Sequence, residues 1–90
     1  MARTIMVELH TLSRAKERGT TKEEICDVIR TGEQSEAKNN RLSRRKVFPF
    51  GQERNGKFYE EKMVEVIYTI DDNTIFTVTA YVFYGKWRKE

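Results

Sequence analysis

The only histidine of the chain, His10, begins a segment whose residue types and spacing could support acid–base chemistry. Arg14 follows four residues later, and Glu17 and Arg18 follow at seven and eight residues. Positions i, i+4, i+7 and i+8 share one face of an α-helix, so a helix here would align one imidazole, two guanidiniums and one carboxylate. We predict that His10, Arg14, Glu17 and Arg18 form a catalytic row.

Such a row contains the groups that RNA cleavage through the 2′-hydroxyl requires. An imidazole can take the hydroxyl proton or protonate the leaving oxygen. Guanidinium groups grip phosphate oxygens and stabilise the charge of the phosphorane. Glu17 could orient His10 or fix an arginine. The structural alternative is that His10 caps or packs near the helix start, while Arg14 forms an ordinary surface ion pair with Glu17 or Glu8.

Two other groups of residues are typical of polyanion binding. Residues 38–46 contain five cations and no acid, and the aromatic residues near the C-terminus lie among lysines and arginines. Aromatic rings interleaved with cations can stack bases while phosphates are neutralised. The structural alternatives are that residues 38–46 form a solvated loop and that the aromatic rings fill a face of the sheet. The predicted nucleic-acid-binding residues are Arg41, Arg44, Arg45, Lys46, Tyr81, Tyr84 and Lys86.

The composition fits one small globular domain over residues 1–90, with a mildly basic net charge of +3. Cys26 is the only cysteine, so we expect no intramolecular disulfide and no cysteine-based zinc site. No paired-histidine metal motif or glycine-rich phosphate loop occurs, and we expect neither a metal nor a cofactor. No signal-peptide or membrane-spanning pattern occurs, so the expected location is cytoplasmic.

Two helices are expected before residue 33. The first covers Leu9–Arg18, with Leu9, Leu12 and Ala15 as apolar positions and Gly19 as a left-handed cap. The second follows two overlapping capping boxes, Thr20 with Glu23 and Thr21 with Glu24. Its apolar stripe and its closing glycine are Ile25, Val28, Ile29 and Gly32.

The rest of the chain reads as strands and turns. Phe76, Val78, Ala80 and Val82 should face the helices, while Ile75, Thr77, Thr79, Tyr81 and Phe83 should form an open face. The expected fold class is α+β, with two N-terminal helices packed on one face of a small antiparallel β-sheet. An edge strand is expected at residues 4–8, and three further strands are expected at 43–50, 63–70 and 74–84, the last of them the longest. Turns are expected at Gly51, at Asn55-Gly56 and at residues 71–73.

The segment His10-x-x-x-Arg14-x-x-Glu17-Arg18-Gly19-Thr20-Thr21, with the helix that follows it to Glu33, resembles domain-of-unknown-function family 4258. That family is similar to the RelE, ParE and BrnT toxins. The resemblance implies a RelE-like fold, and residue by residue it supports only His10, Arg14, Glu17 and Arg18. RelE-like proteins cut messenger RNA without metal, generally on the ribosome, and are usually held inactive by an antitoxin.

The leading hypothesis is a toxin-like, metal-independent endoribonuclease or RNA-binding protein of RelE type. Its expected partners are RNA, with the ribosome as a candidate location, and a cognate antitoxin; a homodimer is also compatible with the sequence. One alternative is a non-catalytic interaction module that binds a protein or nucleic acid through its exposed sheet face. Another is a ParE-like toxin directed at DNA gyrase, which the resemblance allows because ParE proteins share the fold.

Overall fold

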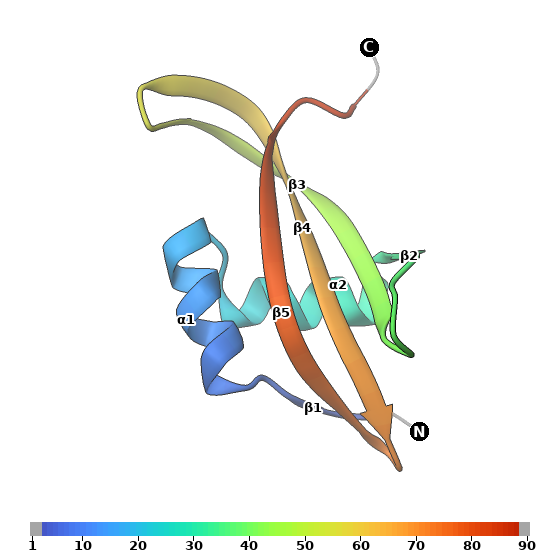
Figure 1. Cartoon of the computed structure of the whole chain (residues 1–90). Helices are drawn as coiled ribbons and strands as arrows, with labels where there is room; N and C mark the ends of the chain where they lie inside the picture. Colours follow the sequence, from blue (N-terminus) through green and yellow to red (C-terminus); the bar gives the residue numbers. More distant parts are fainter. Residues whose placement is uncertain (1–2, 89–90) are drawn as a thin grey trace.

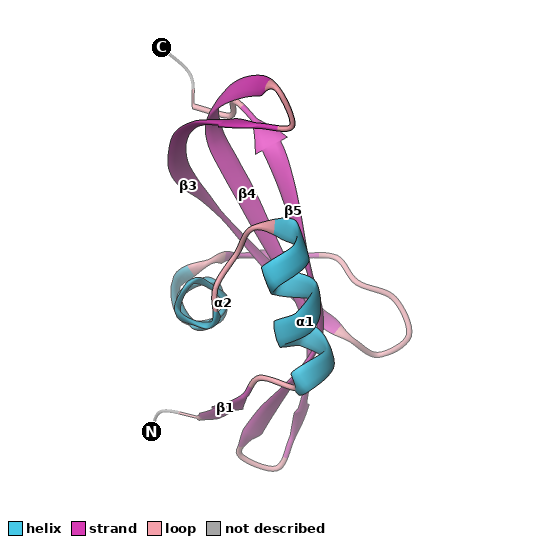
Figure 2. Cartoon of the chain, turned by 90° about the vertical axis from the view of Figure 1, so that its left-hand side faces the viewer, coloured by secondary structure: helices cyan, strands magenta, loops and turns pink. Residues whose placement is uncertain are grey.

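The computed structural model describes residues 3–88, and within them two helices cover one face of a five-stranded sheet (Figures 1 and 2). The strand order is β1-β5-β4-β3-β2. In Figure 2 both helices lie on the same side of the sheet, α1 seen from its side and α2 along its axis. The elements are β1 (Thr4–Met6), α1 (Leu9–Arg18), α2 (Lys22–Thr31), β2 (Glu33–Ser35), β3 (Leu42–Arg54), β4 (Lys57–Asp71) and β5 (Thr74–Gly85).

The α+β class and the two N-terminal helices are confirmed, but the sheet is mixed rather than antiparallel. β2, β3, β4 and β5 pair antiparallel along the sheet. The expected edge strand at the N-terminus is present as β1, and it pairs in parallel with the first residues of β5, Ile5 opposite Ile75. This pairing joins strands that are far apart in the sequence, so no local pattern indicates its direction. Among the described residues, no helix is long and apolar enough to cross a membrane.

Helix α1 begins and ends where the sequence predicts. Gly19 ends it in the left-handed region, at φ 93°, and its N–H donates to the carbonyl of Ala15. The expected apolar face is partly wrong, because Leu9 is 83% exposed while Thr11 is fully buried. Thr11 accepts a hydrogen bond from the Thr77 hydroxyl at 2.9 Å, so a polar contact fixes the start of the helix on β5.

Helix α2 carries the core stripe that the sequence predicts. Ile25, Val28 and Ile29 are buried in a cluster that includes Val64 and Val66 of β4. Burying such side chains stabilises a domain by about 1.5–3 kcal/mol each relative to leaving them exposed. The stripe therefore attaches α2 to the centre of the sheet.

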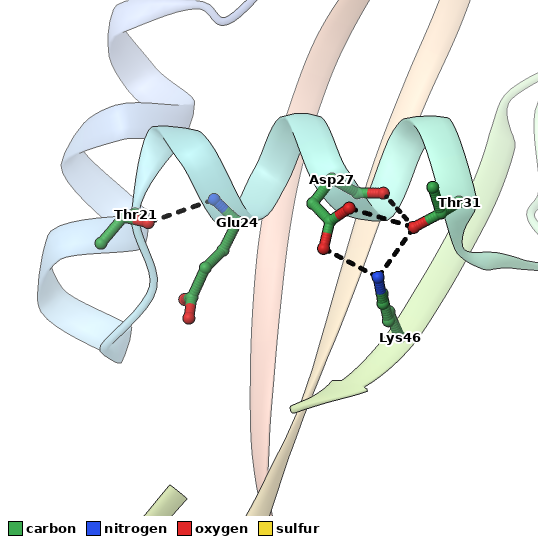
Figure 3. Close-up of polar contacts among 5 residues, drawn as sticks. All are labelled: Thr21, Glu24, Asp27, Thr31 and Lys46. Atoms are coloured by element: carbon green, nitrogen blue, oxygen red, sulfur yellow. Dashed lines mark hydrogen bonds and ion pairs between the residues drawn. The ribbon is translucent and has the colours of Figure 1, made fainter. Parts of the chain in front are cut away.

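At the start of α2, Thr21 is the N-cap as predicted, but only one of the two hydrogen bonds of the expected Thr21–Glu24 capping box is present. The Thr21 hydroxyl accepts from the Glu24 N–H at 3.1 Å (Figure 3). The Thr20 hydroxyl donates instead to the Glu24 carboxylate, so the expected pairing of Thr20 with Glu23 is wrong. After the helix ends at Thr31, a Cβ at Gly32 would meet the carbonyl oxygen of Val28, which explains the glycine.

The strands of the β3–β4 hairpin are longer than expected. Asn55 and Gly56 form its turn as predicted, both with positive φ. Gly51 does not turn the chain: it lies in a register irregularity between Pro49 and Gln52, and β3 continues beyond it. The glycine therefore bends a continuous strand. β4, with 15 residues, is the longest strand, so the prediction for the last strand is wrong.

A bulge in β5 changes which of its residues face the helices. Ile67 of β4 pairs with Thr79 and Tyr68 pairs with Thr77, so Val78 is an extra residue on β5. The predicted faces are right from Thr79 onward and wrong before the bulge, because an extra residue reverses the alternation. Ile75 and Thr77 are buried on the helix side.

Candidate functional site

The predicted catalytic row lies along one flank of α1. His10 is exposed in the first turn, and its side chain has no hydrogen-bond or ion-pair partner within residues 3–88. The Arg14 guanidinium lies 3.4 Å from the Glu17 carboxylate, and both side chains are exposed. Such a surface pair contributes about 0.2–1 kcal/mol and is readily exchanged for another anion. The expected surface pair of Arg14 with Glu17 is present, and Arg14 keeps donors available to solvent.

Arg18 differs from the rest of the row because the structure fixes its head group. Its Nη1 donates to the Ala80 carbonyl at 2.7 Å, and its central carbon lies 5.0 Å from the centroid of the Tyr81 ring. Within the described chain, β1 pairs with β5 only as far as Phe76, so no strand flanks the outer edge of β5 near Ala80. Arg18 therefore holds an edge carbonyl on one side and an aromatic face on the other.

We name the surface that carries His10, Arg14, Arg18 and Tyr81 the α1–β5 strip. α1 follows the outer side of β5 (Figure 1), and His10, Arg14 and Arg18 are spaced by one helical turn each. Tyr81 belongs to the face of the sheet opposite the helices, which we call the open face. The strip therefore combines a titratable imidazole, two cations and an aromatic ring along one edge.

The end of α1, and with it Arg18, is held by side chains from three strands. The carbonyl oxygens of residues 17, 18 and 19 accept hydrogen bonds from Arg54 at 2.9 Å, Tyr84 at 2.6 Å and Lys62 at 2.8 Å. These are carbonyls that a helix end leaves without intrahelical partners. Sequence reasoning missed Arg54 and Lys62. For Lys62 a signal existed, because its position in β4 alternates with the apolar Val64 and Val66.

Tyr84, predicted to bind nucleic acid, lies on the helix side of β5, where its side chain contacts β3, β4 and the end of α1. Its ring packs against Phe50 and Tyr59, at centroid distances of 5.0 and 5.5 Å, and the Arg54 guanidinium lies 4.9 Å from it. Burial raises the pKa of the Tyr84 phenol above its ordinary value, which keeps the hydroxyl a donor to the end of α1.

Arg44, also predicted as a binding residue, likewise points toward the helices. Its Nε donates to the Tyr68 hydroxyl at 3.2 Å, and its Nη1 donates to the Gly32 carbonyl at 2.9 Å. The cation thereby caps the end of α2 and is directed away from the open face.

Lys46 is the third predicted binding residue with a structural role. Its Nζ lies 2.8 Å from both the Asp27 carboxylate and the Thr31 hydroxyl of α2 (Figure 3). The hydrogen bond from Lys46 lowers the pKa of Asp27 below its ordinary value. The Lys46 ammonium group therefore already has two hydrogen-bond partners on α2.

The remaining predicted binding residues are dispersed. Arg41 is exposed in the loop before β3, and Arg45 is exposed on the open face. Lys86 lies 3.5 Å from the Glu60 carboxylate beyond the end of β5. Of the seven residues, only Tyr81 joins the catalytic row.

The open face is partly apolar. Tyr81 and Phe83 are 41% and 45% exposed, and their ring centroids are 6.5 Å apart.

At the end of β5 the chain folds over this face, because the backbone N–H groups of Trp87 and Arg88 both donate to one oxygen of Glu61, at 2.6 and 2.8 Å. The N–H of Arg88 and then that of Trp87 lower the pKa of the Glu61 carboxyl.

Within residues 3–88, no cluster of three or more histidine, cysteine or acidic side chains could hold a metal ion. Cys26 is a free, half-buried thiol. The chemistry that the α1–β5 strip can offer is therefore proton transfer by His10 and charge stabilisation by arginine.

Comparison with known proteins gives one family. The profile of a domain of unknown function, DUF4258, matches residues 7–82. No curated protein matches the chain. No solved structure matches it either, so the RelE-like part of the predicted fold stays a prediction. Since the matched region includes both helices and most of the sheet, the chain belongs to the DUF4258 family, as the segment from His10 to Glu33 indicates.

Proposed function

We propose that this protein binds single-stranded RNA along the α1–β5 strip and cleaves it without metal, as a toxin-like endoribonuclease of RelE type. The observation that carries the proposal is the fixed Arg18 guanidinium, held between the Ala80 carbonyl and the Tyr81 ring on the flank that also bears His10 and Arg14. An arginine held in this way loses little conformational entropy when it binds phosphate.

The proposed reaction is transesterification at one phosphodiester. His10 accepts the proton of the 2′-hydroxyl, and the 2′-oxygen forms a bond to phosphorus. The bond from phosphorus to the 5′-oxygen breaks, that oxygen takes a proton from water, and the hydroxide left behind takes the proton that His10 accepted. The products are a 2′,3′-cyclic phosphate and a 5′-hydroxyl. Arg14 and Arg18 bind the non-bridging oxygens and stabilise the charge of the phosphorane.

Tyr81 supplies a stacking surface next to the phosphate-binding cations. One face of its ring lies against Arg18, and the side chain is 41% exposed. Base–aromatic stacking contributes about 1–3 kcal/mol per base, and it tolerates different sequences because every base has a π-face. The strip can thus bind a nucleotide through both its phosphate and its base. The resemblance to RelE extends the proposal to RNA on the ribosome, a cytoplasmic location and an antitoxin as regulator.

The exposed apolar side chains of the open face favour a second candidate function. Tyr81, Phe83 and Val47 form a surface that a protein or nucleic acid could cover without any reaction. In that case the protein is an interaction module, and His10 has no role. The two functions differ in whether RNA is cut.

Induction of the protein in a bacterial host, with growth and RNA integrity followed together, tests the proposal. We expect growth arrest and fragmented RNA with the wild type, and neither with His10→Ala or Arg14→Ala. Arg30→Ala is the matched control, because Arg30 is an exposed arginine on α2, away from the strip. Intact RNA with all soluble variants would favour the interaction module, and arrest with intact RNA would favour a gyrase-type target.

A further inference from the structure

We propose that a pocket on the open face, between Trp87 and Arg45, binds one unstacked nucleobase of a single-stranded RNA. The inference rests on the proposed RNA-binding function and adds a base-recognition site to it. The pocket has a volume of about 260 Å³. This is smaller than the roughly 300–1,000 Å³ of sites for drug-sized ligands, and it suits a single ring system. It is lined by Glu33, Arg45, Lys46, Val47, Met63 and Trp87.

Trp87 forms a fixed wall of this pocket. Its backbone N–H donates to the Glu61 carboxylate at 2.6 Å, which ties the residue to β4. Its indole ring lies beside Gly85, where an added Cβ would be 3.5 Å from the ring. The side chain is nevertheless 38% exposed. A ring that is held in place but remains accessible can stack a base at a small cost in entropy.

The other residues supply an apolar floor and both kinds of hydrogen-bonding group. Val47 and Met63 are paired neighbours on β3 and β4, and they give the pocket its apolar floor. Arg45 and Glu33 are paired on β3 and β2, and neither side chain has a partner within the described chain. An arginine donor and a carboxylate acceptor beside a stacking ring are the groups that bind the polar edges of a splayed-out base.

The pocket lining carries two charges without a partner in the described chain, the Arg45 cation and the Glu33 carboxylate. Glu61 receives two backbone N–H groups, and Glu65 receives the hydroxyls of Ser35 and Ser43, so protein donors already satisfy both carboxylates. Arg45 remains free to meet an anion. A nucleotide offers an anionic phosphate to Arg45 and base N–H groups to Glu33, whereas an uncharged apolar ligand would leave both charges without a partner.

The pocket and the α1–β5 strip can be joined by one strand of RNA. Phe83 pairs with Met63 at the pocket floor, and its ring lies 6.5 Å from that of Tyr81 in the strip. The path therefore crosses from β5 over β4 to β3, about 10 Å for two strand spacings. The exposed rings of Tyr81 and Phe83 line its start on β5, and the exposed ring of Trp87 lies at its end.

Trp87 is the only tryptophan, so its fluorescence reports on this pocket. The experiment titrates the full chain with a 2′-O-methyl oligoribonucleotide, which the proposed reaction cannot cut. A terminal dye measures RNA binding by anisotropy, while tryptophan emission measures stacking. We expect emission to fall in parallel with anisotropy, and Arg45→Gln to weaken binding about tenfold, the loss expected for one charged hydrogen bond. Arg30→Gln, the matched control, should bind like the wild type, and thermal melts should show all variants folded.

The outcomes separate the two proposals. Anisotropy that rises while tryptophan emission and the affinity of Arg45→Gln stay unchanged would refute the pocket and leave RNA binding intact. No rise in anisotropy would refute RNA binding itself, and with it the pocket as an RNA site. Guanosine monophosphate is titrated in parallel: saturable quenching by this nucleotide without any response to the oligonucleotide would overturn RNA as the source of the base.

Discussion

Removing one hydroxyl group, in Tyr84→Phe, tests how the end of α1 is held. The hydroxyl donates to the carbonyl of Arg18 at 2.6 Å, while the ring packs against Phe50 and Tyr59. The substitution keeps the ring and its packing and removes only the donor. A part-buried carbonyl that loses its partner costs about 1–2 kcal/mol. For a domain of this size, that lowers the melting temperature by about 5–10 °C.

Tyr59→Phe is the matched control, because Tyr59 is also half-buried and its hydroxyl has no hydrogen bond within the described residues. Urea unfolding at pH 7 measures both variants, and we expect a change below about 0.5 kcal/mol for the control. Equal stabilities of the two variants would refute the argument that Tyr84 anchors α1.

The dependence on pH gives the same test a second readout. Burial raises the pKa of Tyr84 above 10.0, so its contribution to stability is complete below that pH and is lost as the pH rises through the folded-state pKa. The difference between the wild type and Tyr84→Phe should therefore shrink in strongly alkaline solution. A difference that grows with pH would contradict the assigned cause.

The remaining predictions concern neighbouring contacts. Lys62→Met should cost about 2–4 kcal/mol in urea unfolding, because it leaves the half-buried Glu24 carboxylate without its cation at 2.8 Å; a cost below 1 kcal/mol would show that the pair is not needed. The folded-state pKa of Glu61 lies below 4.5, so its stabilisation is present at neutral pH. It is lost as the pH falls below 4.5 and through the lower folded-state pKa. Glu61→Gln should flatten the acid limb of stability against pH, and an unchanged limb would refute this. Arg18→Met should weaken RNA binding at least tenfold in anisotropy titrations, whereas unchanged binding would remove Arg18 from the site.

The parts of the fold that follow from local sequence were predictable. Gly19 ends α1 in the left-handed region, Thr21 caps α2, and Asn55-Gly56 turns the β3–β4 hairpin. Each of these is decided by the conformational preference of a few adjacent residues. The buried stripe of α2 follows in the same way from helical spacing.

The features that the sequence did not reveal depend on pairing between distant segments. No glycine marks the bulge at Val78, yet the bulge reverses the faces of the start of β5. Gly51 has the appearance of a turn residue but bends a strand whose partner continues past it. The parallel direction of β1 is decided by its pairing with the start of β5, near the other end of the sequence.

The candidate site was predictable only where it lies on one helix. The alignment of His10, Arg14 and Arg18 follows from the helical period. The contact of Arg18 with the edge of β5 does not, because it requires the packing of α1 on the sheet. Clustered charge in the sequence does not indicate which way Arg44 and Lys46 point: both alternate onto the helix side of β3, where residues at the end of α2 accept their hydrogen bonds.

Cleavage of a single-stranded RNA by the purified protein in the presence of EDTA, beside the same sequence as DNA, measures directly whether the protein is a metal-independent endoribonuclease. We expect that only the RNA is cut, that the products carry 2′,3′-cyclic phosphate ends, and that folded His10→Ala is slower by about 10²–10⁴-fold. Folded wild-type protein that leaves RNA intact, or a His10→Ala variant that cleaves at the wild-type rate, would contradict it.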